Sequence, residues 1–202
     1  MKNIWQIPIM SKHKTTMRKA SKNTDTDKKI QYMTESDAEV VGFDAVKKDY
    51  TSSLHLNTSP SSVDAILQTI SKRYFIEFKN GFIGSKEQNS IIKKVYDSLL
   101  IYGDISKESI SDIRNNTELV LVYNESANKD NDRIRRLDDV ENSPSLEEFS
   151  KNIHRLAKEE YVSFGLNMFQ TYCFSKVHTY TRLEFEKMLD SIDSEQIMRK
   201  DG

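Results

Sequence analysis

Residues 73–79 read Arg-Tyr-Phe-Ile-Glu-Phe-Lys, and this stretch predicts a β-strand more clearly than any other part of the chain. Most of its side chains are aromatic or β-branched, which are the types that strands favour. Because successive side chains point to opposite faces of a strand, Glu77 and Lys79 are expected on one face together with Phe75. The pattern therefore places a carboxylate beside an amine on an otherwise apolar strand.

Two further strands are expected just before it. Residues 62–70 form a short apolar stretch, and only Ser71 and Lys72 separate it from residue 73, which is short enough for a tight reversal. A third candidate strand covers residues 53–57. If residues 62–70 and 73–80 form a hairpin, Asp64 comes near Glu77, although the exact register cannot be read from the sequence.

Helices are expected on both sides of these strands. Apolar residues at helical spacing predict a helix over about 35–49. Another is predicted to begin with a capping box, Ser85 with Gln88, and to end near Gly103. Residues 118–123 are apolar on both faces, as in a strand covered on each side. The expected fold class is therefore α/β, a mixed sheet flanked by helices.

The C-terminal part gives weaker signals. We expect an exposed loop at 125–143, a strand at 167–178, and two helices opened by capping boxes, Ser145 with Glu148 and Thr181 with Glu184. Cys173 is the only cysteine, which excludes an internal disulfide and a thiolate zinc cluster. Within its aromatic stretch, a buried apolar role is favoured over a nucleophilic one.

Length and composition indicate one soluble domain. The chain has 202 residues, 37% of them hydrophobic and 30% charged, with six Gly and three Pro, too few for a fold built on many tight turns. No apolar run approaches the roughly 20 residues of a membrane-spanning helix, and no signal-peptide core follows the N-terminus. A cytoplasmic protein without a membrane partner is expected.

Charge is distributed unevenly along the chain. Residues 1–33 contain eight Lys or Arg and two Asp, a net charge of +6, whereas the remaining 22 basic and 29 acidic residues give residues 34–202 a net charge of −7. We expect 1–33 to be a basic, flexible N-terminal arm, and favour a solubilising leader. The alternative is an arm that screens phosphates. Its basic residues include Lys12, Lys14, Arg18, Lys19 and Lys22.

Asp64, Glu77 and Lys79 together suit one kind of chemistry. Mg²⁺ is held by one or two carboxylates, and water and a substrate phosphate complete its coordination. Such an ion activates water and offsets the charge that develops during phosphodiester hydrolysis. A neighbouring lysine can orient the attacking water or stabilise this charge. Asp64 and Glu77 are therefore the candidate metal ligands, and Lys79 the candidate catalytic lysine.

These residues also carry a family resemblance. Val63-Asp64-Ala65 and Ile76-Glu77-Phe78-Lys79 resemble the Asp and Glu-x-Lys elements of the PD-(D/E)XK nuclease superfamily, which includes many restriction and repair endonucleases. Val63 stands where the family name has proline. The expected order of helix, three-stranded meander, helix and strand over about 35–124 also agrees. The resemblance implies a restriction-endonuclease-like α-β-β-β-α-β core within residues 34–202, followed by a C-terminal α/β extension.

The resemblance implies a Mg²⁺- or Mn²⁺-dependent nuclease that hydrolyses nucleic acid, with DNA as the expected partner and a role in defence or a mobile element. Many nucleases of this fold dimerise to cut both strands, so a homodimer is a further expectation. A catalytically inactive nuclease-fold binding or regulatory module is the alternative, and the acidic body favours it. The third option is an unrelated α/β protein, in which alternating charges on a solvated strand produce Glu-x-Lys by chance.

Some family members add ligands from neighbouring helices. A glutamate from the first helix joins the metal site in some of them, for which Glu39 is the first candidate here and Glu35 the second. Others place a Gln or Lys of the following helix near the catalytic centre, which points to Gln88 or Lys86. Gln88 has the helix-capping role as an alternative.

Overall fold

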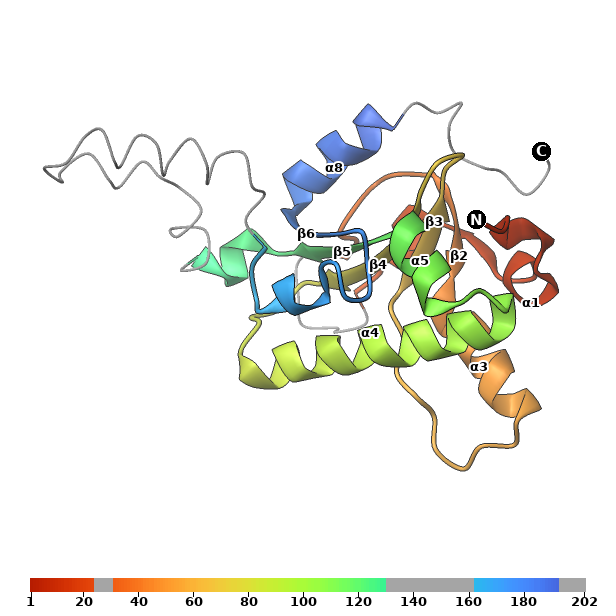
Figure 1. Ribbon diagram of the computed structural model, residues 1–202. Coiled ribbons are helices and arrows are strands. Elements are labelled where there is room, and N and C mark those ends of the chain that lie inside the picture. The colour runs from red at the N-terminus through yellow and green to blue at the C-terminus, as the bar shows by residue number, and fades with distance from the viewer. Residues whose placement is uncertain (24–30, 130–161, 193–202) are drawn as a thin grey trace, which may run out of the picture.

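In the part of the chain that the structure describes, six strands form one open, mixed sheet with helices on both of its faces (Figure 1). This computed structural model describes residues 1–23, 31–129 and 162–192. The strands lie in the sheet in chain order, antiparallel from β1 to β4 and parallel from β4 to β6. They are β1 (Lys14–Thr16), β2 (Glu39–Gly42), β3 (Ala65–Gln68), β4 (Arg73–Lys79), β5 (Thr117–Tyr123) and β6 (Lys176–Thr181). The expected α/β class is confirmed.

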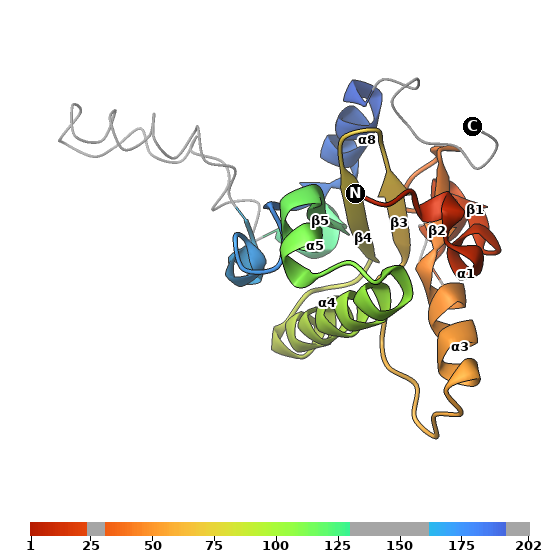
Figure 2. The ribbon, with the colours of Figure 1, turned by 45° about the vertical axis from the view of Figure 1, so that its right-hand side comes forward.

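The described helices range from single turns to one of 22 residues. They are η1 (Ile4–Gln6), α1 (Pro8–Ser11), α2 (Met17–Ala20), α3 (Phe43–Ser53), α4 (Ser85–Ser106), α5 (Ile110–Asn116), η2 (Glu125–Ala127), η4 (Leu166–Phe169) and α8 (Arg182–Ser191). In the two ribbon views, α4 runs along one side of the sheet and α8 lies on the other (Figures 1 and 2).

The β3–β4 hairpin matches the prediction from residues 62–80. Ala65 pairs with Ile76, and Gln68 with Arg73. The reversal is closed by Thr69, whose backbone amide donates to the carbonyl of Lys72 at 2.8 Å. The candidate site lies at the opposite end of this hairpin, where β3 begins and β4 ends.

Each face of the sheet carries its own apolar core. On the α4 face, Phe75 packs among buried residues that include Val95 and Tyr102. On the α8 face, Ile76 lies in a second cluster with Phe185. All seven residues of β5 are buried, as expected of a strand covered on both sides. Glu77 and Lys79 share the face of Phe75, so they project toward α4.

The helix expected at 35–49 is wrong in its first half. Residues 39–42 form β2, and the helix α3 begins only at Phe43. The β-branched pair Val40 and Val41 is fully buried, with β2 hydrogen-bonded between β1 and β3. Pairing on both sides therefore outweighs the helical spacing of this segment. The strand expected at 53–57 is also wrong, because α3 continues to Ser53 and a turn follows.

The N-terminal segment differs from the flexible arm that we expected over 1–33. Its described residues pack into the domain: Ile4, Met10 and Met17 are fully buried, and Lys14–Thr16 forms the edge strand β1. The apolar residues interspersed among its lysines supply this packing, and a buried polar contact adds to it, since the Ile4 amide donates to Oε1 of Gln68 at 2.9 Å. The segment is thus part of the sheet domain.

Local signals at the helix ends were right in one case and wrong in another. Thr181 and Glu184 form the predicted capping box at the start of α8. Ser85 does not cap α4, whose N-cap is Gly84 without a side-chain hydrogen bond. The strand expected at 167–178 begins only at Lys176. The helix expected at Ser145 and most of the loop expected at 125–143 lie outside the described residues.

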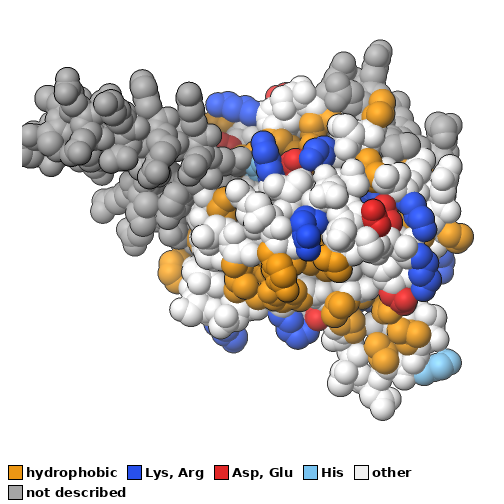
Figure 3. Space-filling view, in the orientation of Figure 1, with side chains coloured by type: hydrophobic (Ala, Val, Ile, Leu, Met, Phe, Trp, Pro, Cys, Tyr) orange, Lys and Arg blue, Asp and Glu red, His pale blue; other side chains and the backbone are white. Residues whose placement is uncertain are grey.

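Within the described residues, no helix is both long enough and apolar enough to cross a membrane. In Figure 3, basic and acidic side chains lie scattered over the displayed face, and hydrophobic side chains gather over the region of α4.

Candidate functional site

Asp64 and Glu77 are brought together by the open end of the β3–β4 hairpin. Asp64 immediately precedes β3, and its amide donates to the carbonyl of Ile76 at 3.0 Å. Its Oδ2 accepts a 2.7 Å hydrogen bond from the amide of Phe78. Glu77 lies between these two residues of β4 and is fully buried. The hairpin register therefore fixes both carboxylates, as the sequence suggested.

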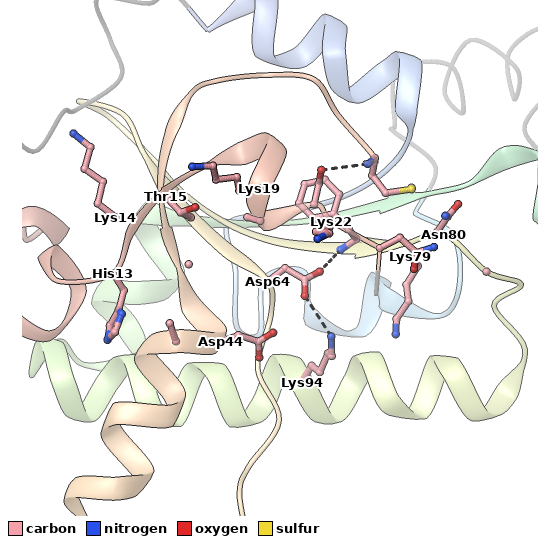
Figure 4. A pocket seen from close by; sticks show the side chains of 18 of the residues that line it. His13, Lys14, Thr15, Lys19, Lys22, Asp44, Asp64, Lys79, Asn80 and Lys94 are labelled. Carbon is pink, nitrogen blue, oxygen red and sulfur yellow. Dashed lines mark hydrogen bonds and ion pairs between the residues drawn. The ribbon is translucent and has the colours of Figure 1, made fainter. Parts of the chain in front are cut away.

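Two lysines approach these carboxylates from different elements. Nζ of Lys79, from the end of β4, lies 3.6 Å from Oε1 of Glu77. Nζ of Lys94, from α4, lies 2.7 Å from the same oxygen and 3.6 Å from Oδ1 of Asp64. Lys94 thus bridges the two carboxylates, as Figure 4 shows for its Asp64 contact.

Burial and the shared negative charge perturb the pKa values of this group. Burial, and then the charge of Asp64, raises the pKa of Glu77 to about 8, although Lys94 and Lys79 act in the opposite direction. Burial likewise raises the pKa of Asp64 despite the charge of Lys94 and the Phe78 amide. Burial alone would lower the pKa of Lys94, but Glu77 and Asp64 outweigh it and raise this pKa. Within this group, Lys94 and Lys79 are the positive charges that offset the two buried carboxylates.

A third carboxylate, Asp44, comes from the first turn of α3. The amide of Phe43 donates to the carbonyl of Asp64 at 3.0 Å, which holds the start of α3 against β3. Oδ1 of Asp44 accepts hydrogen bonds from Ser62 and Lys47 at 2.6 and 2.8 Å. Its charge contributes to the raised pKa of Asp64. Asp44 was not among the expected site residues because the start of α3 was misplaced.

Glu39, the first candidate for an additional metal ligand, is not with the others. It lies in β2, opposite Thr16 of β1, and its Oε1 pairs with Nζ of Lys14 at 2.5 Å. Gly42 pairs with Ala65, so Glu39 is three residues farther along the strand, roughly 10 Å from the Asp64 end. Glu35, the second candidate, pairs instead with Arg18 at 2.7 Å.

The helix following β4 contributes Lys94 and neither of the two residues that were expected. Lys86 and Gln88 lie in the first turn of α4, whereas Lys94 lies two turns later and reaches the carboxylates. The sequence held one signal for it. Lys94 is three residues after the buried Ile91 and four before the buried Ser98, so it falls on the stripe of α4 that faces the sheet.

A cleft of about 870 Å³ opens in front of this site. Asp44, Asp64, Lys79 and Lys94 line it (Figure 4), whereas Glu77 is fully buried and is not part of the lining. Most of the other charged residues around the cleft are basic. From the N-terminal segment these are Lys12, Lys14, Lys19 and Lys22. The cleft therefore combines an acidic floor with a basic wall.

The donor set fits a hard divalent cation. No group of three or more His, Cys, Asp or Glu side chains is placed to share a metal within the described part of the chain. One or two carboxylates are nevertheless enough for Mg²⁺, which keeps several waters and binds substrate phosphate. Oε2 of Glu77 is buried and has no hydrogen-bond partner among the residues that the structure describes. An orphaned carboxylate oxygen beside Asp64 is a suitable ligand for such an ion.

No protein-family model, curated protein or solved structure matches the chain.

Proposed function

We propose that the protein is a metal-dependent nuclease with a restriction-endonuclease-like core of the PD-(D/E)XK type. The observation that carries the proposal is the convergence of Asp64, Glu77 and Lys79 at the floor of a lysine-lined cleft. Two carboxylates suit Mg²⁺ or Mn²⁺, and the basic wall suits a substrate with many phosphates. Phosphodiester hydrolysis of nucleic acid uses both features.

The topology supports the proposal with one difference. Strands β2, β3 and β4 form an antiparallel meander, α4 follows, and β5 pairs in parallel with β4. The helix α3, however, lies between the first two strands of this meander and not before it. In place of the expected Glu39, α3 presents another acidic residue, Asp44, to the same cleft.

Each residue has a defined part in the proposed reaction. Asp64 and Glu77 would hold the divalent cation, which when bound supplies an activated water and offsets negative charge on the phosphate. Lys79, whose side chain is 24% exposed, would hold the attacking water by hydrogen bonding or stabilise the phosphate charge as it develops. Lys94 would keep the buried Glu77 carboxylate compensated before the cation arrives.

The experiment is a cleavage assay with single-stranded DNA, duplex DNA and RNA in Mg²⁺ and in Mn²⁺. Wild-type protein is compared with Asp64→Asn and Lys79→Met, and with Asp104→Asn as a control on the exposed side of α4. We expect cleavage by the wild type and the control, and its loss in the other two variants. Equal cleavage by all four proteins would refute the assignment.

The ion pair between Lys94 and Glu77 supports a second candidate function. Nζ of Lys94 at 2.7 Å from Glu77 provides the positive charge that a metal would otherwise supply. On this reading, the domain is a nucleic-acid-binding or regulatory module that keeps the fold without the reaction. Calorimetry with Mn²⁺ separates the two functions, because only the nuclease requires binding heat that Asp64→Asn abolishes.

A further inference from the structure

The basic wall of the cleft contains two lysines whose ammonium groups are not paired with any described carboxylate. Lys12 pairs with Asp49 at 2.6 Å, and Lys14 pairs with Glu39. Lys19 and Lys22, in contrast, are exposed and form no ion pair with any acidic residue that the structure describes. Both border the cleft, in which Figure 4 shows the Lys22 side chain beside Asp64 and that of Lys19 farther away. Uncommitted ammonium groups in a groove suit phosphate oxygens.

The lining of the cleft also includes an exposed aromatic ring. Phe82 lines the cleft three residues after Lys79, no more than about 10 Å farther along the chain. It is 67% exposed although its neighbour Ile83 is buried. A large apolar side chain left in solvent beside a row of lysines is the combination found in nucleic-acid-binding grooves that stack bases.

Asn128 holds the backbone of the loop that carries Phe82 through two hydrogen bonds. Oδ1 of this buried asparagine accepts a hydrogen bond from the amide of Ile83 at 2.9 Å, and its Nδ2 donates to the carbonyl of Gly81 at 3.1 Å. These two bonds bracket Phe82 on both sides. The ring is thus displayed on a fixed backbone, which reduces the entropy lost when a ligand stacks on it.

We propose that this cleft binds a single strand of nucleic acid, with its phosphates on Lys19 and Lys22 and an unpaired base stacked on Phe82. The inference rests on the proposed function, for which it specifies the substrate class. The N-terminal segment then acts as a backbone-binding wall, and the strand crosses the acidic floor between the lysines and the ring.

A single strand fits better than a duplex for two reasons. In a duplex each base is stacked between its neighbours, so a ring at the cleft rim has no base face to contact unless the base is unpaired. The cleft volume of about 870 Å³ also lies in the range of pockets that enclose small ligands. A few nucleotides of one strand fill such a volume.

The phosphate contacts are tested by the salt dependence of binding. Fluorescent 12-nucleotide oligothymidylate and oligouridylate are titrated in EDTA, which prevents cleavage, at several salt concentrations. The double variant Lys19→Gln/Lys22→Gln should bind more weakly and reduce the slope of log affinity against log salt by about 1.4, since each contact to a single strand contributes about 0.7. Lys93→Gln/Lys187→Gln, the same charge change at two other exposed positions, should leave the slope unchanged.

The stacking contact is tested separately. Phe82→Ala should lower affinity roughly tenfold without changing the salt slope, because stacking releases no counterions. Phe82→Tyr keeps the aromatic face and should retain the affinity. Equal losses in both variants would contradict stacking. Asn128→Ala should weaken binding in the same direction as Phe82→Ala if the bracket positions the ring.

A duplex of the same length is titrated under the same conditions. Weaker binding of the duplex than of both oligonucleotides supports the proposal. Duplex binding as tight as single-strand binding, or an unchanged slope in Lys19→Gln/Lys22→Gln, overturns it. Cleavage of duplex DNA without single-strand binding would overturn this inference and leave the nuclease proposal standing. Single-strand binding without cleavage in any metal would support this inference and contradict the nuclease proposal.

Discussion

The ammonium group of Lys94 lies 2.7 Å from Oε1 of Glu77 and 3.6 Å from Oδ1 of Asp64, so one helix supplies the cation that compensates two carboxylates of a hairpin. These carboxylates are the ones that would hold a divalent ion. A lysine and a metal ion are therefore expected to compete electrostatically for the same oxygens.

Replacing Lys94 with Met should tighten the binding of Mn²⁺ by about tenfold or more, because two cations a few ångströms apart repel by several kcal/mol even in a partly solvated site. Calorimetry at pH 7 measures the change. Lys93→Met is the matched control, since Lys93 is exposed and pairs with Asp97 on the outer side of α4. Weaker Mn²⁺ binding by Lys94→Met would mean that the lysine organises the ligands and does not compete with the ion.

Lys79→Met should lower kcat of nucleic-acid cleavage by about 10²- to 10³-fold, the usual cost of losing one group that stabilises transition-state charge. Mn²⁺ affinity should change far less, because Lys79 lies 3.6 Å from Glu77 and is not a ligand. Single-turnover cleavage at saturating metal isolates the chemical step. A variant that recovers full activity at high metal concentration would show that Lys79 assists only metal binding.

Glu108 should stabilise the fold in a pH-dependent way. Its side chain is 6% exposed and pairs at 3.0 Å with Arg73, which is fully buried. Although burial acts to raise the pKa of Glu108, hydrogen bonds from Tyr102 and Lys2 and the charge of Arg73 lower it below its ordinary value of 4.5. A depressed folded-state pKa means that this stabilisation is complete above about pH 5 and is lost as the pH falls through that pKa.

Urea unfolding of wild-type protein and Glu108→Gln tests this prediction. At pH 7 the variant should be less stable by about 3 kcal/mol, because a buried charge on Arg73 loses its partner. The difference should shrink as the pH falls below the lowered pKa of Glu108, because the carboxylate then becomes protonated in the wild type. Asp190, an exposed carboxylate in α8, provides the control substitution Asp190→Asn. A difference that stays constant with pH would exclude the ionic explanation.

Two helix starts with similar sequences should respond differently to the loss of a hydroxyl. Thr181 accepts a hydrogen bond from the amide of Glu184, so Thr181→Ala should cost about 1 kcal/mol of unfolding free energy. Ser85 makes no capping bond, so Ser85→Ala should be within about 0.5 kcal/mol of the wild type. Urea denaturation of both variants at one pH is sufficient. Equal losses would mean that Ser85 also caps its helix.

The features that were predicted correctly are local ones. Strand β4 has a strong pattern of its own, and the short link before it closes a tight hairpin, so the proximity of Asp64 and Glu77 followed from about 16 residues of sequence. The continuous apolar run of β5 identified a strand covered on both faces for the same reason.

The features that were missed depend on pairing over long distances in the sequence. Val40 and Val41 lie in a segment whose apolar residues recur at helical spacing, but in the structure this segment pairs with a strand on each side. β1 cannot be identified from the sequence because it consists only of the three residues Lys14–Thr16. Once β2 is in place, α3 begins at Phe43 and carries Asp44 toward the cleft. Lys94 reaches the site because α4 packs on the sheet. The apolar periodicity of this helix predicts that it packs, but it does not identify the strands that the helix packs against.

The edge strand β1 also bears on how the molecule avoids association with copies of itself. An exposed strand edge is a template for pairing with other chains, and proteins protect such edges by keeping them short and placing lysine on them. β1 has only three residues and begins with Lys14. Two molecules that approached edge to edge would bring their basic segments together, and the resulting repulsion would be strongest at low ionic strength. The charge of this segment should therefore help to keep the sheet from extending into a fibre.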